Sequence, residues 1–222
     1  DRKRLASCKP LAYVIGWIPF LDCKIYLDSH PLIPLSETEY WVEKAIQEVS
    51  GSRFQVSAFK VLDLFAGSGC IGVAVEKHLP EASVDFGEIE EKHFLTIQKN
   101  ILENNIEQSR TRIIQTDVLS AITDSYDYIF ANPPYLTESR IERIGKSVLD
   151  HEPHEALFAD DYGFSLIQKT IQGLPDHLNP GGALYIEHEP EHAEAIVKLA
   201  QKIDFSAITY PDQYGVARYS VL

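Results

Sequence analysis

The sequence contains no methionine and only three cysteines among its 222 residues. A chain without an initiator methionine is expected to be a fragment or a trimmed form of a longer protein. Cys8, Cys23 and Cys70 are too widely spaced for a zinc site, and their odd number gives no disulfide framework. Cysteines used in this way suit a reducing compartment, so a cytoplasmic location is predicted.

The sequence also lacks a long apolar run and a surplus of basic residues. No stretch of about 18 apolar residues is present, which excludes a membrane-spanning helix and predicts that no membrane is a partner. Acidic side chains outnumber basic ones by 33 to 20, so the net charge is −13. Affinity for nucleic acids comes largely from Lys and Arg that neutralise phosphates. Direct binding to DNA or RNA is therefore not expected.

From residue 60 onward, strand-like segments alternate with helical patterns of about ten residues, which indicates crossover connections and a mostly parallel sheet. The last two strands have no helix between them and are expected to pair as an antiparallel hairpin. We predict an α/β fold: a seven-stranded, mostly parallel, Rossmann-like sheet with helices on both faces and an antiparallel last strand. The predicted strands are 60–65, 82–88, 112–115, 126–131, 183–187, 208–210 and 218–222, and the predicted helices are 71–78, 93–104, 164–174 and 191–202.

Residues 1–35 mix short apolar stretches with turns. Residues 11–15 and 24–27 have the composition of strands, so a small N-terminal hairpin is predicted. Ser36 is followed by Glu39 three residues later, which is the pattern of a capping box and predicts that a helix begins at Ser36. The longest irregular stretch, residues 136–158, is long enough to predict a functional loop that becomes ordered when substrate binds.

A glycine-rich segment, residues 63–72, lies between a predicted strand and a predicted helix. Gly67 and Gly69 permit a sharp turn and let a ligand approach where a Cβ would interfere. Glu88 ends the next predicted strand, where a carboxylate can bind both hydroxyls of a ribose. Gly67 to Gly72 also matches G-x-G-x-x-G, so a dinucleotide such as NAD is an alternative ligand, and a tight turn without any ligand is another.

The residues around these glycines favour a different cofactor. A dinucleotide places its pyrophosphate at the helix N-terminus, whereas S-adenosylmethionine has no phosphate and carries an ammonium group that Asp63 suits, directly or through water. The pattern Asp63-x-x-x-Gly67-x-Gly69 resembles the first motif of class I S-adenosylmethionine-dependent methyltransferases. The resemblance implies that Asp63, Phe65, Gly67 and Gly69 bind this cofactor and that Asp117 holds its adenine amine.

The segment Asn132-Pro133-Pro134-Tyr135 follows the fourth predicted strand. Two prolines fix the backbone and remove two N–H donors, which leaves mostly acceptors and one aromatic ring. The Asn132 side-chain oxygen and the Pro133 carbonyl can each accept one N–H of a planar group, and the Tyr135 ring can lie against its face. We predict catalytic roles for Asn132, Pro133 and Tyr135, substrate contacts for all four residues, and a cofactor contact for Asn132. A rigid turn with a packing tyrosine is the structural alternative.

This second motif resembles the one shared by methyltransferases that modify exocyclic amines or amide nitrogens, and the wider sequence resembles the release factor glutamine methyltransferase family. The resemblance implies that residues 1–35 are a stub and linker, without the family's N-terminal helical domain, and that residues 36–222 are the methyltransferase catalytic domain. Leu35-Ser36 departs from the family's Arg-Pro, and Glu189 from its usual glycine. The segments that carry the resemblance are 10–16, 32–39, 152–157, 179–182 and 187–188.

The resemblance implies methylation of a glutamine side-chain amide in a protein, with S-adenosylhomocysteine as the by-product. The expected target is the Gly-Gly-Gln loop of a peptide-chain release factor, and the expected enzyme is a monomer. Alternatives are a ribosomal-protein glutamine methyltransferase, an adenine-amine methyltransferase acting on DNA or RNA, a noncatalytic scaffold that binds the cofactor, and a dinucleotide oxidoreductase. Tyr135 is expected to restrict the planar group without donating a proton, and no general base is predicted.

Residues 188–192 match the zinc-protease pattern H-E-x-x-H. That pattern binds metal only when both histidines share one face of a helix. Pro190 cannot lie inside a helix but suits a first helical position, which leaves His188 outside the helix. No metal site is predicted.

Overall fold

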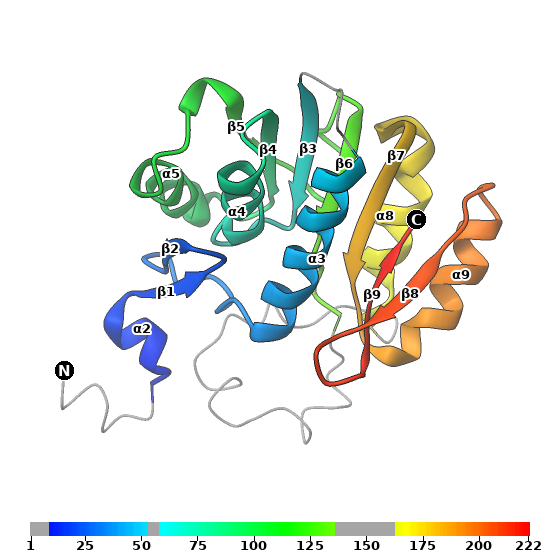
Figure 1. The fold of residues 1–222 in the computed structure, drawn as a ribbon, viewed down its shortest axis with the longest axis horizontal. Coiled ribbons are helices and arrows are strands. Elements are labelled where there is room, and N and C mark those ends of the chain that lie inside the picture. Colours follow the sequence, from blue (N-terminus) through cyan, green and yellow to red (C-terminus); the bar gives the residue numbers. More distant parts are fainter. Residues whose placement is uncertain (1–8, 53–57, 136–162) are drawn as a thin grey trace.

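The computed structural model describes residues 9–52, 58–135 and 163–222 (Figure 1). Its main sheet has seven strands in the order β5-β4-β3-β6-β7-β9-β8, and a separate two-stranded sheet pairs β1 with β2. The strands are β1 (Trp17–Phe20), β2 (Cys23–Tyr26), β3 (Phe59–Leu64), β4 (Ala82–Glu88), β5 (Thr111–Gln115), β6 (Tyr126–Ala131), β7 (Leu178–Glu187), β8 (Ile208–Pro211) and β9 (Ala217–Val221). The α-helices are α2 (Leu11–Ile15), α3 (Ser36–Ser52), α4 (Cys70–His78), α5 (Phe94–Glu103), α8 (Ser165–His177) and α9 (Ala193–Gln201).

The strand pairing confirms the predicted topology. Strands β5, β4, β3, β6 and β7 are joined by parallel pairings. Strand β9 lies between β7 and the edge strand β8 and is antiparallel to both. The predicted bounds of β4 and β6 are those observed, and all seven predicted strands are present.

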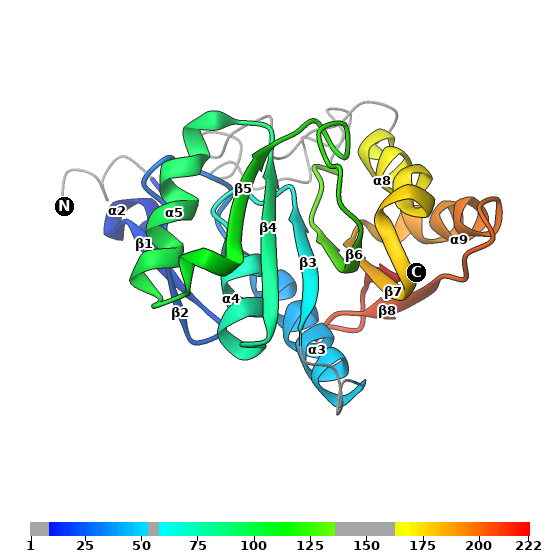
Figure 2. The ribbon, with the colours of Figure 1, turned by 90° about the horizontal axis from the view of Figure 1, so that it is seen from above.

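Two layers of helices cover the sheet. Helices α3 and α4 lie on one face, and α8 and α9 lie on the other (Figures 1 and 2). Because successive side chains of a strand point to opposite faces, Phe130 of β6 stacks on Trp41 of α3, whereas its neighbour Ile129 belongs to the apolar cluster that contains Ile171 of α8. Each face of the sheet therefore has its own apolar core.

The predicted N-terminal hairpin is present, and the strand predicted at residues 24–27 corresponds to β2, but the other predicted strand is wrong. Residues 11–15 form helix α2, not a strand, and β1 and β2 form the hairpin. Pro10 precedes the helix, and Gly16, with φ of +91°, ends it by donating its N–H to the Ala12 carbonyl. Five apolar residues alone cannot distinguish a strand from a short helix, so the flanking Pro and Gly decide.

The hairpin packs on helix α5 through two asparagines. Asn100 Oδ1 accepts the N–H of Tyr26 at 2.7 Å, and Asn104 Oδ1 accepts the N–H of Lys24 at 2.8 Å. Asn100 Nδ2 also donates to the Ser68 carbonyl at 2.8 Å. The hairpin is thereby connected to the glycine-rich loop after β3.

Helix α3 begins at Ser36 as predicted, but the predicted capping box is wrong. Ser36 Oγ donates to Glu37 Oε2, and Glu39 Oε1 accepts the N–H of Leu21 at 2.8 Å. Glu39 therefore joins α3 to the hairpin rather than capping its own helix. The predicted functional loop, residues 136–158, lies outside the described residues. Within the described ranges, no helix has the length and apolarity needed to span a membrane.

Candidate active site

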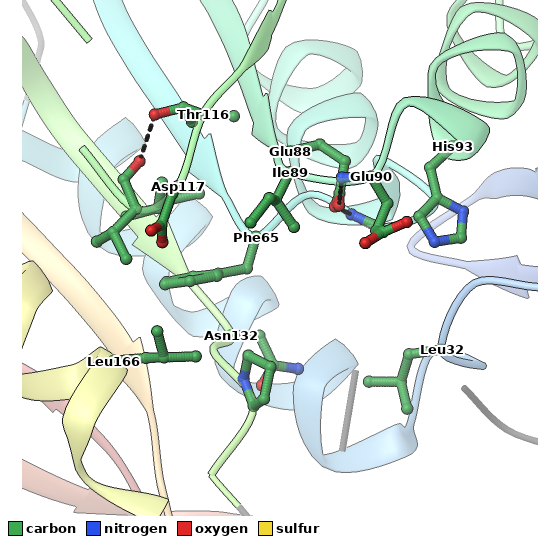
Figure 3. Close-up of a pocket in the computed structure, with 15 residues that line it drawn as sticks. Leu32, Phe65, Glu88, Ile89, Glu90, His93, Thr116, Asp117, Asn132 and Leu166 are labelled. Carbon is green, nitrogen blue, oxygen red and sulfur yellow. Dashed lines mark hydrogen bonds between the residues drawn. The ribbon is translucent and has the colours of Figure 1, made fainter. Parts of the chain in front are cut away.

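The candidate site lies at the carboxyl ends of the parallel strands. Strand β3 lies between β4 and β6, so the chain proceeds from it in both directions across the sheet. Such a switch point is where open α/β sheets bind ligands. A cavity of about 240 Å³ is found there (Figure 3). Its lining residues are Leu32, Leu64, Phe65, Gly67, Gly87, Glu88, Ile89, Glu90, His93, Thr116, Asp117, Val118, Asn132, Pro134 and Leu166.

The glycine-rich loop connects β3 to α4 as predicted. Gly67 and Gly69 have φ of +54° and +75°, a left-handed conformation that other residues rarely adopt. A Cβ on Gly69 would also lie 3.2 Å from Ile97. Phe65 lines the cavity with φ of +65° although it is not a glycine. Strain of this kind is concentrated at binding sites, where surrounding contacts maintain it.

Glu88 lies at the end of β4 and is held by backbone groups. Its Oε2 accepts the N–H of Gly67 at 2.7 Å, and its Oε1 accepts the N–H of Glu90 at 2.8 Å. Burial raises the pKa of this carboxyl group, and the backbone N–H groups oppose that shift. Glu88 lines the cavity, and its carboxylate oxygens retain lone pairs beyond those used by the two N–H groups.

Asp63 does not line the cavity. Its Oδ2 accepts the N–H of Gly72 at 2.8 Å, in the first turn of α4. Its buried Oδ1 has no hydrogen-bond partner among the described residues. Burial raises the pKa of Asp63 well above its usual value. Asp63 therefore joins the end of β3 to the first turn of α4 across the loop, and its contact with a cofactor stays a prediction.

Asp117 lines the cavity after β5, and Figure 3 shows it on the same side as Phe65 and Leu166, with Glu90 and His93 on the other side. Several lining residues were not predicted from the sequence. Glu90 lines the cavity and was given no role from the sequence. Its position two residues after Glu88 was an available signal. The other lining residues missed are Leu32, Leu64, Gly87, Ile89, His93, Thr116, Val118 and Leu166.

The Asn-Pro-Pro-Tyr turn follows β6 at the same edge of the sheet. Asn132 and Pro134 line the cavity, and Pro133 is buried. Asn132 Nδ2 lies 3.4 Å from Thr38 Oγ1. The Tyr135 hydroxyl donates to Glu187 Oε1 at 2.8 Å. Burial and the Glu187 charge raise the pKa of Tyr135 well above 10, which agrees with a residue that keeps its proton.

Glu187 ends β7 and is fully buried. Thr38 Oγ1 and Trp41 Nε1 both donate to its Oε2, at 2.8 and 2.7 Å. Glu187 was expected at a strand end by resemblance, and no role was predicted for it. Its three donors come from α3 and the turn after β6, which the linear sequence does not bring together.

The zinc-protease pattern does not form the geometry that such a site requires. Pro190 is the first residue of a short 3-10 turn, Pro190–His192, and His188 precedes this turn. The buried His188 ring lies 2.8 Å from Ser220 Oγ through its Nε2. The two histidines therefore do not share one face of a helix.

These features define a class I methyltransferase. They are the strand order, the glycine-rich loop after β3, the carboxylate of Glu88 at the end of β4, and the Asn-Pro-Pro-Tyr turn after β6. The family model described as methyltransferase small domain matches residues 50–160. A release factor glutamine methyltransferase of Lactococcus lactis is 34% identical over 200 residues, covering 90% of this chain and 71% of that protein. One from Flavobacterium psychrophilum is 34% identical over 96% of this chain and 74% of its own length. The chain belongs to the release factor glutamine methyltransferase family.

Solved structures agree on the fold. A methyltransferase from Pyrococcus furiosus matches with a TM-score of 0.64 and 17% identity, over 99% of this chain and 95% of that one. Family and fold together imply S-adenosylmethionine as the methyl donor. The site fits this molecule, because Gly67 leaves space at the cavity wall and Glu88 presents a held carboxylate.

Proposed function

We propose that this chain transfers a methyl group from S-adenosylmethionine to the side-chain amide nitrogen of a glutamine in a peptide-chain release factor. The observation that carries the proposal is the position of Asn132, which lines the cavity with its Nδ2 directed at Thr38. Its Oδ1 is then the atom available to accept an N–H from a planar amide. The Gly-Gly-Gln loop as the target follows from the family resemblance.

Most of the residues that would hold the cofactor line the cavity. Glu88 would accept the ribose hydroxyls, and Asp117 the adenine amine. The left-handed backbone at Gly67 and Gly69 would allow close approach. Phe65 and its apolar neighbours would contact the planar base. Asp63 would act on the ammonium group through water, because its unpaired Oδ1 is buried behind the loop. When bound, the sulfonium supplies an electrophilic methyl group.

The substrate amide is a poor nucleophile because its nitrogen lone pair is delocalised into the carbonyl. Asn132 Oδ1 and the Pro133 carbonyl would accept its two N–H groups and return electron density to nitrogen. Tyr135 would restrict the planar group with its ring while its hydroxyl remains bound to Glu187. Fixed orientation of two reactants can account for about 7–11 kcal/mol of a barrier. No residue need remove a proton before attack, since the proton can leave to water afterwards.

A radiolabelled methyl-transfer assay tests this function, with a release factor, a mixture of ribosomal proteins and duplex DNA offered side by side. We expect label on the release factor, and a loss of at least about a hundredfold in Asn132→Ala. Asn179→Ala is the matched control, because Asn179 lies near the opposite end of β7 and contacts Asp127.

The alternatives give distinct outcomes. Label on a ribosomal protein would move the target to another glutamine substrate. Label on DNA would move the chain to the amine-methylating enzymes that act on nucleic acids. We further propose that residues 36–222 form the catalytic domain and that the hairpin before them serves as its support, as its bonds to Asn100 and Asn104 indicate.

A further inference from the structure

Helix α3, strand β7 and the turn after β6 are joined by a buried set of hydrogen bonds. Glu187 Oε2 accepts from both Trp41 Nε1, at 2.7 Å, and Thr38 Oγ1, at 2.8 Å. Thr38 Oγ1 in turn lies 3.4 Å from Asn132 Nδ2. Asn132, which lines the cavity, is thus connected through Thr38 to the carboxylate of Glu187, which does not line the cavity.

Counting protons fixes the direction of each bond. An indole N–H can only donate, so Trp41 requires Glu187 Oε2 to be an acceptor. Burial raises the pKa of Glu187, and the hydrogen bonds from Trp41, Thr38 and Tyr135 oppose that shift. When Glu187 is ionised, the Thr38 hydroxyl, which has one proton and faces the same oxygen, donates that proton to Glu187. What it offers Asn132 is a lone pair. Asn132 must therefore present its NH₂ group to Thr38 and direct Oδ1 elsewhere.

We propose that Thr38, held by Trp41 and Glu187, is a positioning residue that selects the orientation of the Asn132 amide and keeps Oδ1 available to the substrate. This inference rests on the proposed function, in which the substrate amide offers two N–H donors. A flipped Asn132 would place its own NH₂ group against those donors. The selection affects the rate of methyl transfer and leaves cofactor affinity unchanged, because the Glu88 side of the cavity is not involved.

Thr38→Val tests the proposal, since it removes the hydroxyl and nearly preserves the shape. Thr170→Val is the matched control, because Thr170 is also fully buried and donates to the Leu166 carbonyl at 2.9 Å. At saturating cofactor we expect Thr38→Val to lower kcat about a hundredfold, the scale of a misplaced catalytic group. The Kd for S-adenosylmethionine should stay within about threefold of the original value. Thr170→Val should keep kcat, and Thr38→Ser should restore it to within about fivefold, because serine retains the hydroxyl.

A second measurement does not depend on turnover. The side-chain amide resonance of Asn132 can be assigned in a ¹H–¹⁵N spectrum by its loss in Asn132→Ala. Thr38→Val should shift this resonance and speed its hydrogen exchange, whereas Thr170→Val and Thr38→Ser should not.

The outcomes separate this inference from the proposed function. Full kcat in Thr38→Val, or an unchanged Asn132 resonance, would overturn the positioning role. A chain that methylates no glutamine but shows the shifted resonance would lose the proposed function and keep the orientation of Asn132. A loss of kcat that Thr38→Ser does not rescue would also overturn the inference, because the hydroxyl would then not be the cause.

Discussion

Glu88 and Glu187 occupy similar places in the sheet and have opposite surroundings. Each ends a parallel strand, β4 or β7, and each is buried. Glu88 accepts backbone N–H groups and lines the cavity, whereas Glu187 accepts three side-chain donors and lies outside the cavity lining. A carboxylate held by backbone keeps lone pairs for a ligand, while one surrounded by side chains orients those side chains. Position at a strand end does not by itself define a binding residue.

The largest expected effect is on stability, in Glu187→Ala. Removing this acceptor leaves the Trp41, Thr38 and Tyr135 donors buried without a partner, which should lower the free energy of unfolding by about 3–5 kcal/mol. Glu88→Ala should cost clearly less, because water in the cavity can satisfy the Gly67 and Glu90 N–H groups. Urea denaturation measures both. Equal losses in the two variants would contradict the contrast.

The second expected effect is on cofactor affinity. Here the change at Glu88 should have the larger effect and the change at Glu187 the smaller one. Glu88→Gln exchanges a charged acceptor facing the cavity for a neutral one, and should weaken S-adenosylmethionine binding by about 1.5–3 kcal/mol, roughly ten- to a hundredfold. Glu187→Gln should change the Kd by less than about threefold, since Glu187 does not line the cavity. Isothermal titration calorimetry compares the two. A comparable loss in Glu187→Gln would mean that the carboxylate at β7 also reaches the cofactor.

The main sheet could be predicted because its strands carry strong local signals. Ala82–Glu88 alternates apolar and other residues, Tyr126–Ala131 is largely apolar, and both were predicted with the observed bounds. The weaker cases lie where local signals conflict. Helix α8 continues to His177 with Pro175 in its last turn, beyond the predicted end at residue 174. Strand β7 starts at Leu178, five residues earlier than predicted, because its pairing with β6 extends to Tyr126 despite the Asn-Pro-Gly-Gly segment.

The candidate site likewise has residues that local motifs predict and contacts that they do not. Gly67, Glu88, Asp117 and Asn132 were predicted from motifs that follow strands, and all four line the cavity. Asp63 belonged to the same motif, yet its carboxylate bonds to the α4 backbone, a distinction that spacing cannot make. The bonds from Thr38 and Trp41 to Glu187 span 149 and 146 residues of sequence. Contacts of that range depend on how α3 packs on the sheet, which no local pattern specifies.

A third buried glutamate, Glu76 of α4, gives the smallest expected effect and shows what a buried carboxylate does with a single charged partner. Arg110 Nη2 lies 3.2 Å from Glu76 Oε1, and both carboxylate oxygens lack a hydrogen-bond partner within the described part of the chain. Burial raises the pKa of Glu76 to about 7, and Arg110 opposes this shift only in part. The folded state therefore holds this proton at pH values where the unfolded chain has released it.

Stability linked to Glu76 is fully present below its unfolded pKa of about 4.5 and is lost as the pH rises through about 7. Glu76→Gln resembles the neutral acid, so its unfolding free energy relative to the original chain should increase between pH 4.5 and 8, by about 1 kcal/mol after allowance for solvent screening. Urea denaturation of both proteins across this pH range measures the difference, and the contributions of the other titrating groups cancel because both proteins contain them. A difference that stays flat, or that falls with pH, would show that Arg110 keeps Glu76 ionised.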